Sequence, residues 1–337
     1  MKAEALPLRP ASVQDAFSRH RLSWIDALPW VAAVLVYFAF PTYLALGTLV
    51  MISIIFALAL DLALGYGGVA SLGHAAFFGI GAYAAGIWAL HVTSEPFSGL
   101  VVAGLAGGLG ALMVGPLLLK TRGLTLVMLT LAVATLLQAI ANADWCKPVT
   151  GGADGLFGYQ IAPLFGRFAF DLEGQTGYWY AAGVMAVVFF VSKAIVNSPF
   201  GLTIRGIREN QVRMRMLGVP VVRRLVMLYV VSGAMAAIAG GISAQVTRLV
   251  GLDSLAFMQS GNVLVMLILG GMGSLYGAFL GATVFVVLSD RAAEIDPFNW
   301  LFAVGIVLIL AVRFAPQGLV GLIETAADRV GWRRDSR

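Results

Sequence analysis

Long stretches without any charged residue dominate this sequence and constrain its fold more than any other feature. Residues 27–60, 225–247 and 254–289 contain no Asp, Glu, Lys or Arg, and several shorter stretches resemble them. A run of about 18 uncharged, mostly apolar residues is long enough to cross a bilayer as a helix. Only 12% of the residues are charged, whereas soluble domains carry about 25%. The sequence therefore predicts an all-α, polytopic membrane protein.

Ten apolar segments are candidate spans, each about as long as the hydrocarbon core requires of a helix. They are residues 28–44, 46–65, 69–90, 98–119, 123–141, 177–196, 225–246, 254–271, 275–289 and 299–315. The eighth and ninth segments are the weakest predictions, because together they also fit one long helix. Basic residues concentrate in cytoplasmic loops, and ten spans with a cytoplasmic N-terminus place 18 of the 22 Lys and Arg there. We therefore expect a helical bundle of about ten transmembrane spans with glycine-broken helices and both termini in the cytoplasm.

These spans divide the chain into three parts. A transmembrane domain covers residues 24–315, and cytoplasmic tails cover residues 1–23 and 316–337. The longest connections are an external loop, 142–176, and a cytoplasmic loop, 197–224. The net charge of +5 does not indicate nucleic-acid binding, because the basic residues lie in loops beside the spans.

Two glycine-rich segments resemble each other. Residues 67–79 read GGVASLGHAAFFG and residues 270–281 read GGMGSLYGAFLG. Glycine-interrupted segments at matching places in two halves of a membrane protein indicate a central transport pathway. Glycine-rich helices also resemble each other by composition alone, so a repeat and a chance likeness stay open as equal alternatives. The candidate pathway residues are Asp61, Gly68, Ser71, Gly73, His74, Gly271 and Ser274.

Asp61 and His74 are ionisable residues within predicted spans. An ionisable side chain at membrane depth is costly to bury and is functional by default. Structural roles remain open for both residues: helix pairing or capping for Asp61, and satisfaction of the broken backbone for His74.

The cytoplasmic loop contains the pattern of a short amphipathic helix. No proline interrupts residues 202–217, and apolar residues recur there as on one helical face. These apolar residues are Ile204, Ile207, Met214 and Leu217. Gly218 suits a C-cap and Pro220 ends the helix. Such a helix fits either the membrane surface or a groove on a soluble partner.

Four motifs resemble, in the same order, those of the branched-chain amino-acid ABC permeases of the LivM type. They are YGGVASLGHAAFFGIGAYAAG (66–86), VTGGADGL (149–156), NSPFGLTIRGIRENQ…MLGVP (197–220) and GGMGSLYGAFLGA (270–282). The resemblance implies a permease subunit that imports branched-chain or related amino acids across the bacterial inner membrane by alternating access. Permeases for urea or short amides look similar and are the nearest alternative.

The resemblance also implies the partners: two ATP-binding-cassette ATPase subunits that hold ATP and Mg, a second related permease subunit in a heterodimer, a periplasmic or extracellular solute-binding protein, and membrane lipid. The cytoplasmic loop then supplies the coupling helix, and its residues for ATPase contact are Arg205, Ile207, Arg208, Glu209, Asn210, Leu217 and Gly218. The resemblance places the external mouth at Thr150, Gly151, Gly152 and Asp154, and an ordinary glycine-rich external turn is an equal alternative for these residues. Arg215 stands where the family commonly has an acidic residue, which implies a particular cognate ATPase.

The sequence contains no motif for chemistry of its own. It has no G-x-x-x-x-G-K-[ST] loop and no H-E-x-x-H, and its single cysteine, Cys146, excludes an internal disulfide. We therefore expect a transport subunit that is not an enzyme and binds no cofactor itself. An ion-coupled secondary transporter remains an alternative, for which Asp61 is the one candidate coupling residue.

Overall fold

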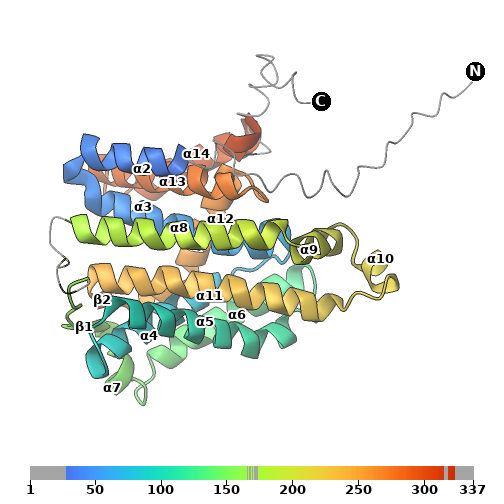
Figure 1. Ribbon diagram of the computed structural model, residues 1–337, viewed down its shortest axis with the longest axis horizontal. Helices are drawn as coiled ribbons and strands as arrows, with labels where there is room; N and C mark the ends of the chain where they lie inside the picture. Colours follow the sequence, from blue (N-terminus) through green and yellow to red (C-terminus); the bar gives the residue numbers. More distant parts are fainter. Residues whose placement is uncertain are drawn as a thin grey trace, which may run out of the picture.

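The computed structural model describes residues 28–322 except 165, 167, 169, 171–173 and 315–317, and these residues are mostly helical (Figure 1). The tail predicted for residues 1–23 lies outside the described residues, as does most of the tail predicted for 316–337. The longer helices are α2 (Leu28–Ala39), α3 (Leu44–Leu60), α4 (His74–His91), α5 (Pro96–Leu118), α6 (Leu124–Ala141), α8 (Gln175–Asn197), α9 (Pro199–Glu209), α11 (Val221–Thr247), α12 (Phe257–Gly270), α13 (Leu275–Ile295) and α14 (Trp300–Phe314). The short elements are η2 (Pro41–Tyr43), the π-helical turn η3 (Asp61–Tyr66), α7 (Lys147–Thr150), η4 (Gly152–Asp154), β1 (Leu156–Phe157), α10 (Gln211–Met216), β2 (Leu249–Val250) and η5 (Leu252–Leu255).

Within the described residues each predicted span contains a helix, but a count of ten spans is not confirmed. Five helices are long and apolar enough to cross a membrane alone: α5, α6, α8, α11 and the continuous stretch Pro41–Tyr66. The α12–α13 pair counts as a sixth only as a broken span, because the two helices are bent by 116°. That bend also rules out one long helix over residues 254–289. The first boundary was wrong as well, because the chain breaks at Phe40, before Pro41 opens η2.

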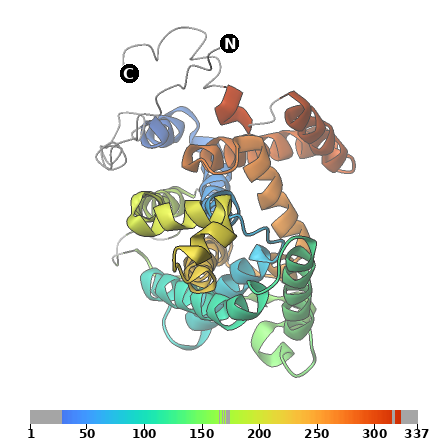
Figure 2. The ribbon, with the colours of Figure 1, turned by 90° about the vertical axis from the view of Figure 1, so that its right-hand side faces the viewer.

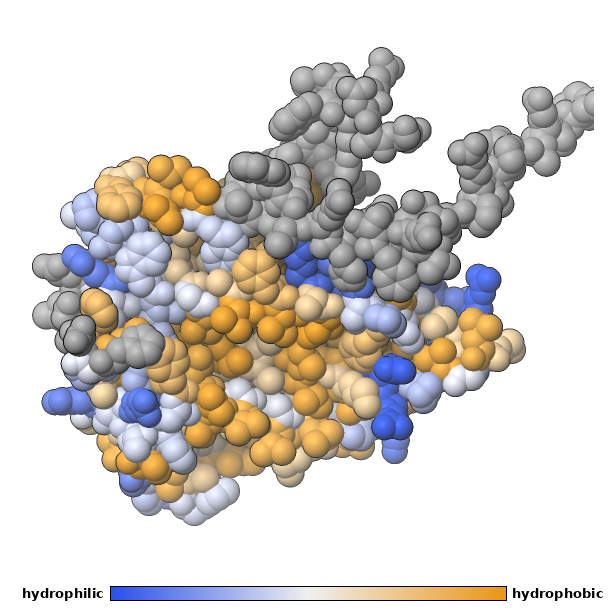
Figure 3. Space-filling model, in the orientation of Figure 1, coloured by the Kyte–Doolittle hydropathy of each residue, from blue (hydrophilic) through white to orange (hydrophobic). Residues whose placement is uncertain are grey.

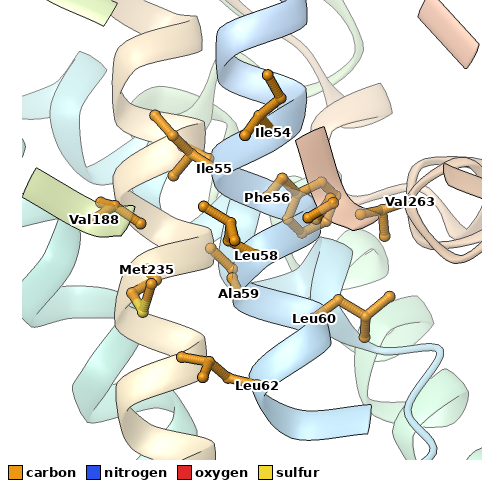
Figure 4. Packing of buried hydrophobic residues seen from close by; sticks show 14 of the residues in the cluster. Ile54, Ile55, Phe56, Leu58, Ala59, Leu60, Leu62, Val188, Met235 and Val263 are labelled. Atoms are coloured by element: carbon orange, nitrogen blue, oxygen red, sulfur yellow. The ribbon is translucent and has the colours of Figure 1, made fainter. Parts of the chain in front are cut away.

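Helix α3 lies at the centre of the bundle. Its apolar residues point in all directions, and Ile55 and Leu58 are completely buried. A helix that is apolar all round belongs inside a bundle rather than at its surface. Figure 4 shows Val188 of α8, Met235 of α11 and Val263 of α12 near α3. Packing against α3 therefore joins helices from distant parts of the chain.

Helix α11 packs closely against α4 and α5 through small residues. A Cβ added to Gly240 would overlap the Phe78 carbonyl of α4, and one added to Gly107 of α5 would overlap Ala237 of α11. Small residues let helix backbones approach in the absence of a hydrophobic driving force between them. The glycine content of these helices is thus used for close packing.

The longest helices run roughly along the long axis, so their connections gather at two opposite ends (Figures 1 and 2). Helices α9 and α10 form one end, and α7 with the antiparallel pair β1–β2 forms the other. Apolar residues make a broad band across the middle of the face in Figure 3, with hydrophilic residues mostly toward the ends. A lateral apolar band and polar ends are what a bilayer requires of a multi-pass membrane protein.

Candidate functional site

The amphipathic helix predicted for residues 202–217 is present but divided in two. Ser198 caps the start of α9 with its side chain. Asn210 then interrupts the helix with φ −154° and ψ 98°, and its Oδ1 accepts a hydrogen bond from the Arg213 N–H at 2.9 Å. Gly218 follows α10 at φ +79°, which is the left-handed conformation predicted for a glycine C-cap. The loop therefore consists of two short helices with separate caps.

One face of α9 packs into the bundle. Ile204 and Ile207 are 1% and 0% exposed. Both were correctly placed on an apolar face. Ile207, which the family resemblance named for ATPase contact, has its side chain buried against this chain, and that role stays a prediction.

Two arginines of α9 contact the membrane domain, Arg205 from a half-buried position and Arg208 from an exposed one. The Arg205 guanidinium lies 5.4 Å from the centre of the Tyr66 ring and donates to the Val196 carbonyl at 3.1 Å. The Arg208 guanidinium donates to the Gly65 carbonyl. Gly65 and Tyr66 end the π-helical turn η3, whose last carbonyls have no helical partner. The arginine side chains thus bind the end of the π-helical turn η3 and the last turn of α8.

The outer face of the same loop is exposed. Glu209 and Asn210 are exposed, and Met216 and Leu217 are 84% and 70% exposed. Leu217 had been predicted on the apolar face of Ile207. It lies elsewhere because the helix is interrupted at Asn210, so the spacing of a single helix no longer applies. Two large apolar side chains, Met216 and Leu217, are therefore exposed at this end of the bundle.

The two glycine-rich segments meet beside α9. The Asp61 carboxylate accepts a hydrogen bond from the Gly273 N–H through Oδ1 at 2.7 Å. A Cβ on Gly65 would lie 2.6 Å from the same nitrogen. Gly68 and Gly273 have φ values of +67° and +82°, and a Cβ on either would lie 3.1–3.2 Å from the Arg208 side chain. We call Asp61, Gly65, Gly68, Arg208 and Gly273 the glycine junction.

Asp61 is not fully satisfied at this junction. It is completely buried, and among the described residues its Oδ2 has no hydrogen-bond partner. Arg208 is the positive charge that acts on the carboxylate. A buried charge without a close partner is costly, so this oxygen is a feature that packing alone does not explain.

Gly271 and Ser274 lie in the second glycine-rich segment, at the break between α12 and α13. Gly271 has φ +112°, and a Cβ on Gly318 would lie 2.7 Å from the Gly270 carbonyl carbon. Part of the predicted C-terminal tail, residues 318–322, is thus helical and begins against this break. Ser274 precedes α13, and within the described chain its side chain makes no capping hydrogen bond.

A second polar cluster holds the start of α4. His74 Nε2 lies 2.8 Å from Ser232 Oγ, and the Ser232 hydroxyl donates to the Ala59 carbonyl at 2.6 Å. Because this hydroxyl has a single proton and the carbonyl only accepts, His74 donates from Nε2. Ser71 Oγ lies 3.4 Å from the Tyr229 hydroxyl. His74 thus bonds a side chain of α11 and not the broken backbone, and both its structural and its pathway role stay predictions.

Hydroxyl groups of α6 and α12 complete the cluster and were not predicted. Thr130 Oγ1 accepts from the Leu72 N–H at 3.2 Å, and Ser260 Oγ accepts from the Ala75 N–H at 2.9 Å. Gly73 packs against Thr130, with its added Cβ 3.1 Å from the threonine Cβ. Serine and threonine in apolar helices commonly bond their own backbone, so the sequence carried no signal for these partners.

The predicted external residues lie at the other end of the bundle. Thr150 Oγ1 donates to the Ala141 carbonyl at 2.6 Å. Gly151 and Gly152 have φ values of +74° and +58°, and Asp154 is exposed. The segment therefore makes the tight turns that its glycines predicted. Its role as a mouth for solute stays a prediction.

An exposed ion pair lies next to these turns. The Lys147 ammonium donates to the Asp144 carboxylate at 2.5 Å. This hydrogen bond lowers the pKa of Asp144 and raises the pKa of Lys147. Both side chains are open to solvent, so the pair contributes little to stability. Among the described residues no three His, Cys, Asp or Glu side chains are grouped to hold a metal ion.

Comparison with known proteins identifies the family of this chain. A family described as "Branched-chain amino acid transport system / permease component" matches residues 42–312. The high-affinity branched-chain amino acid transport system permease protein LivM of Escherichia coli is 26% identical over 283 residues, which cover 77% of this chain and 66% of that protein. The match thus spans just under two thirds of that relative's length. No solved structure matches the chain.

Two further relatives show the breadth of the similarity. The probable branched-chain amino acid transport permease protein LivM of Methanocaldococcus jannaschii is 23% identical over 291 residues, covering 77% of this chain and 81% of that protein. The ribose import permease protein RbsC of Bacillus subtilis is 28% identical over 170 residues, covering 46% of this chain and 52% of that protein.

Proposed function

The chain belongs to the family of permease components of branched-chain amino acid transport systems, and we propose that it is the membrane-embedded permease subunit of an ATP-driven importer for branched-chain or related amino acids. It moves solute by alternating access, while two separate ATP-binding-cassette subunits bind Mg and ATP and hydrolyse the nucleotide. A second, related permease subunit pairs with it, and a solute-binding protein delivers the solute. The assembly lies in the bacterial inner membrane with both termini in the cytoplasm.

The open tip of the α9–α10 loop is the observation that carries this proposal. Met216 and Leu217 are large apolar side chains exposed at a polar end of the molecule, and Arg213 and Arg215 lie beside them on α10. An apolar centre rimmed by charged groups is typical of a protein–protein contact. The chain has no phosphate-binding G-x-x-x-x-G-K-[ST] loop of its own, so the proposal assigns ATP to the partner docked here.

The proposed pathway passes the two glycine breaks. Asp61 and Gly68 flank this route at the glycine junction, and Gly271 and Ser274 flank it between α12 and α13. Ser71, Gly73 and His74 flank it at the start of α4. Unwound segments between helix halves are where membrane transporters place their moving parts and solute contacts. At the other end, the turns of residues 150–154 provide the proposed surface for the solute-binding protein.

Reconstitution tests the proposal. The chain, co-expressed with its candidate permease and ATPase partners, is expected to purify with both in mild detergent. In proteoliposomes, leucine uptake is expected to require ATP and the solute-binding protein. Isolation without any ATPase, together with uptake that dissipates a proton gradient, would instead identify a secondary transporter coupled through the buried Asp61.

The solute requires a separate measurement. Calorimetry on the cognate binding protein is expected to show binding of leucine, isoleucine or valine. Urea and short amides test the nearest alternative within the family. Ribose is included because the match to a ribose import permease shows that similar chains serve unrelated solutes. Binding of urea or ribose alone would contradict the amino-acid assignment.

A further inference from the structure

We propose that Arg208 is a positioning residue for transport: it ties the movement of α9 to both glycine breaks, and Asp61 receives its guanidinium when α9 moves. This inference rests on the proposed function, since it describes how an ATPase docked on α10 reaches the pathway. It differs from the ATPase contact that the family resemblance implies, because the contacts of Arg208 used here are with Gly65, Gly68 and Gly273 of the same chain.

A single side chain reaches both breaks. Arg208 donates to the Gly65 carbonyl, which is 143 residues away in the sequence. The same side chain limits the space at Gly68 and Gly273, where an added Cβ would lie 3.1 Å from Cγ and 3.2 Å from Nη1. Both glycines have positive φ values that side chains rarely adopt. The two glycine breaks therefore both pack against the Arg208 side chain.

Asp61 offers Arg208 a second acceptor. Its Oδ1 already holds the Gly273 N–H at 2.7 Å, while its Oδ2 is buried without a partner among the described residues. A guanidinium binds a carboxylate more strongly than it binds a neutral carbonyl, and it can bind both oxygens at once. Movement of Arg208 from the Gly65 carbonyl to the carboxylate then weakens the hold of Asp61 on Gly273. The two breaks are free to separate as a result.

Helix α9 is suited to transmit such a movement. It has 11 residues and its own side-chain cap at Ser198. Ile204 and Ile207 on its inner face are buried next to the arginines. A displacement imposed at α10 thus shifts α9 as a unit, because a short helix with a packed face moves more easily than it unfolds. Arg208, close to the end that joins α10, is carried along.

The test uses the assembled transporter with one cysteine on each break. Leu64→Cys and Met272→Cys flank Gly65 and Gly273, in a Cys146→Ser background, and a short bifunctional thiol reagent reports their proximity. In the parent complex we expect trapping with ATP and vanadate to lower cross-linking several-fold. In Arg208→Gln we expect ATPase subunits to stay bound, the response to nucleotide to disappear and uptake to fall about tenfold, as for loss of one charged hydrogen bond.

Matched variants separate positioning from folding. Arg122→Gln removes the same charge from an exposed loop and should leave the response intact. Arg208→Lys keeps the charge but lacks the planar guanidinium, and it should retain part of the nucleotide response that Arg208→Gln loses. Uptake by the double variant Asp61→Asn with Arg208→Gln should be no lower than uptake by Arg208→Gln alone.

The outcomes distinguish the two proposals. A parent chain that binds no ATPase overturns the proposed function and this inference with it. A normal nucleotide response in Arg208→Gln overturns only the inference. Loss of ATPase binding in Arg208→Gln also overturns it, because Arg208 would then be a docking contact.

Discussion

Ser232 connects three helices at the start of α4. Its hydroxyl donates to the Ala59 carbonyl of α3 and accepts from His74 of α4, although Ser232 itself lies on α11. Removing it leaves a buried imidazole N–H without its acceptor. Buried polar groups are costly when unpaired, although hydrogen bonds between membrane helices are each worth only about 1 kcal/mol.

We therefore expect Ser232→Ala to destabilise the protein by about 1–2 kcal/mol. The matched control is Ser192→Ala, a buried serine whose hydroxyl, among the described residues, bonds only the Val188 carbonyl of its own helix. That variant should change stability by less than about 0.5 kcal/mol. Unfolding midpoints in detergent measure both. Equal losses would show that the Ser232 bonds contribute nothing beyond burial.

At the scale of single elements, α3 illustrates how a break is stabilised. Its last turn, Asp61–Tyr66, is π-helical, and the Gly67 N–H bonds Leu62 five residues back. Such turns widen the helix and leave carbonyls at its end without helical partners. Arg208 supplies a partner for Gly65 from another element. The break is therefore held by tertiary contacts and not by local sequence alone.

Close packing of α11 on α4 gives a prediction for these elements. In Gly240→Ala the new methyl group overlaps the Phe78 carbonyl and lies 2.7 Å from its carbon. Because the clash is with backbone, the helices must separate, and we expect a loss of about 1–3 kcal/mol. In Gly183→Ala on α8 the new methyl group meets no atom within 4 Å, so stability should not change. Thermal unfolding in detergent compares the two, and a stable Gly240→Ala variant would contradict the packing.

At the scale of the whole molecule, the two ends are expected to face opposite sides of the membrane. The α9–α10 loop and the turns of residues 150–154 lie at opposite ends of the bundle (Figure 1). In a Cys146→Ser background, Asn210→Cys should react with a membrane-impermeant thiol reagent only in inverted vesicles. Ala153→Cys should react in right-side-out vesicles or spheroplasts. Labelling of both from one side would exclude a bundle that spans the membrane in this way.

The sequence predicted the parts of the fold that local chemistry decides. Apolar segments became helices because a bilayer leaves the backbone no other way to satisfy its N–H and C=O groups. Gly218 ends a helix, and residues 150–152 make turns, because glycine alone adopts positive φ without strain. The family resemblance added the function class, which the match over residues 42–312 supports.

Tertiary structure decided which residues meet. Periodicity placed Ile204 and Ile207 on the buried face and Arg208 on the exposed side, both correctly. It could not foresee that the Arg208 guanidinium donates to a carbonyl 143 residues away. The hydrogen bond from Gly273 to Asp61 joins residues 212 positions apart, and no local pattern encodes it. The count of ten spans stays unconfirmed, and the charge pattern could not predict the 116° bend between α12 and α13, because a bend depends on what packs beside it. Local hydrogen bonding and burial select helices, whereas the partners of buried polar groups exist only once those helices have packed together.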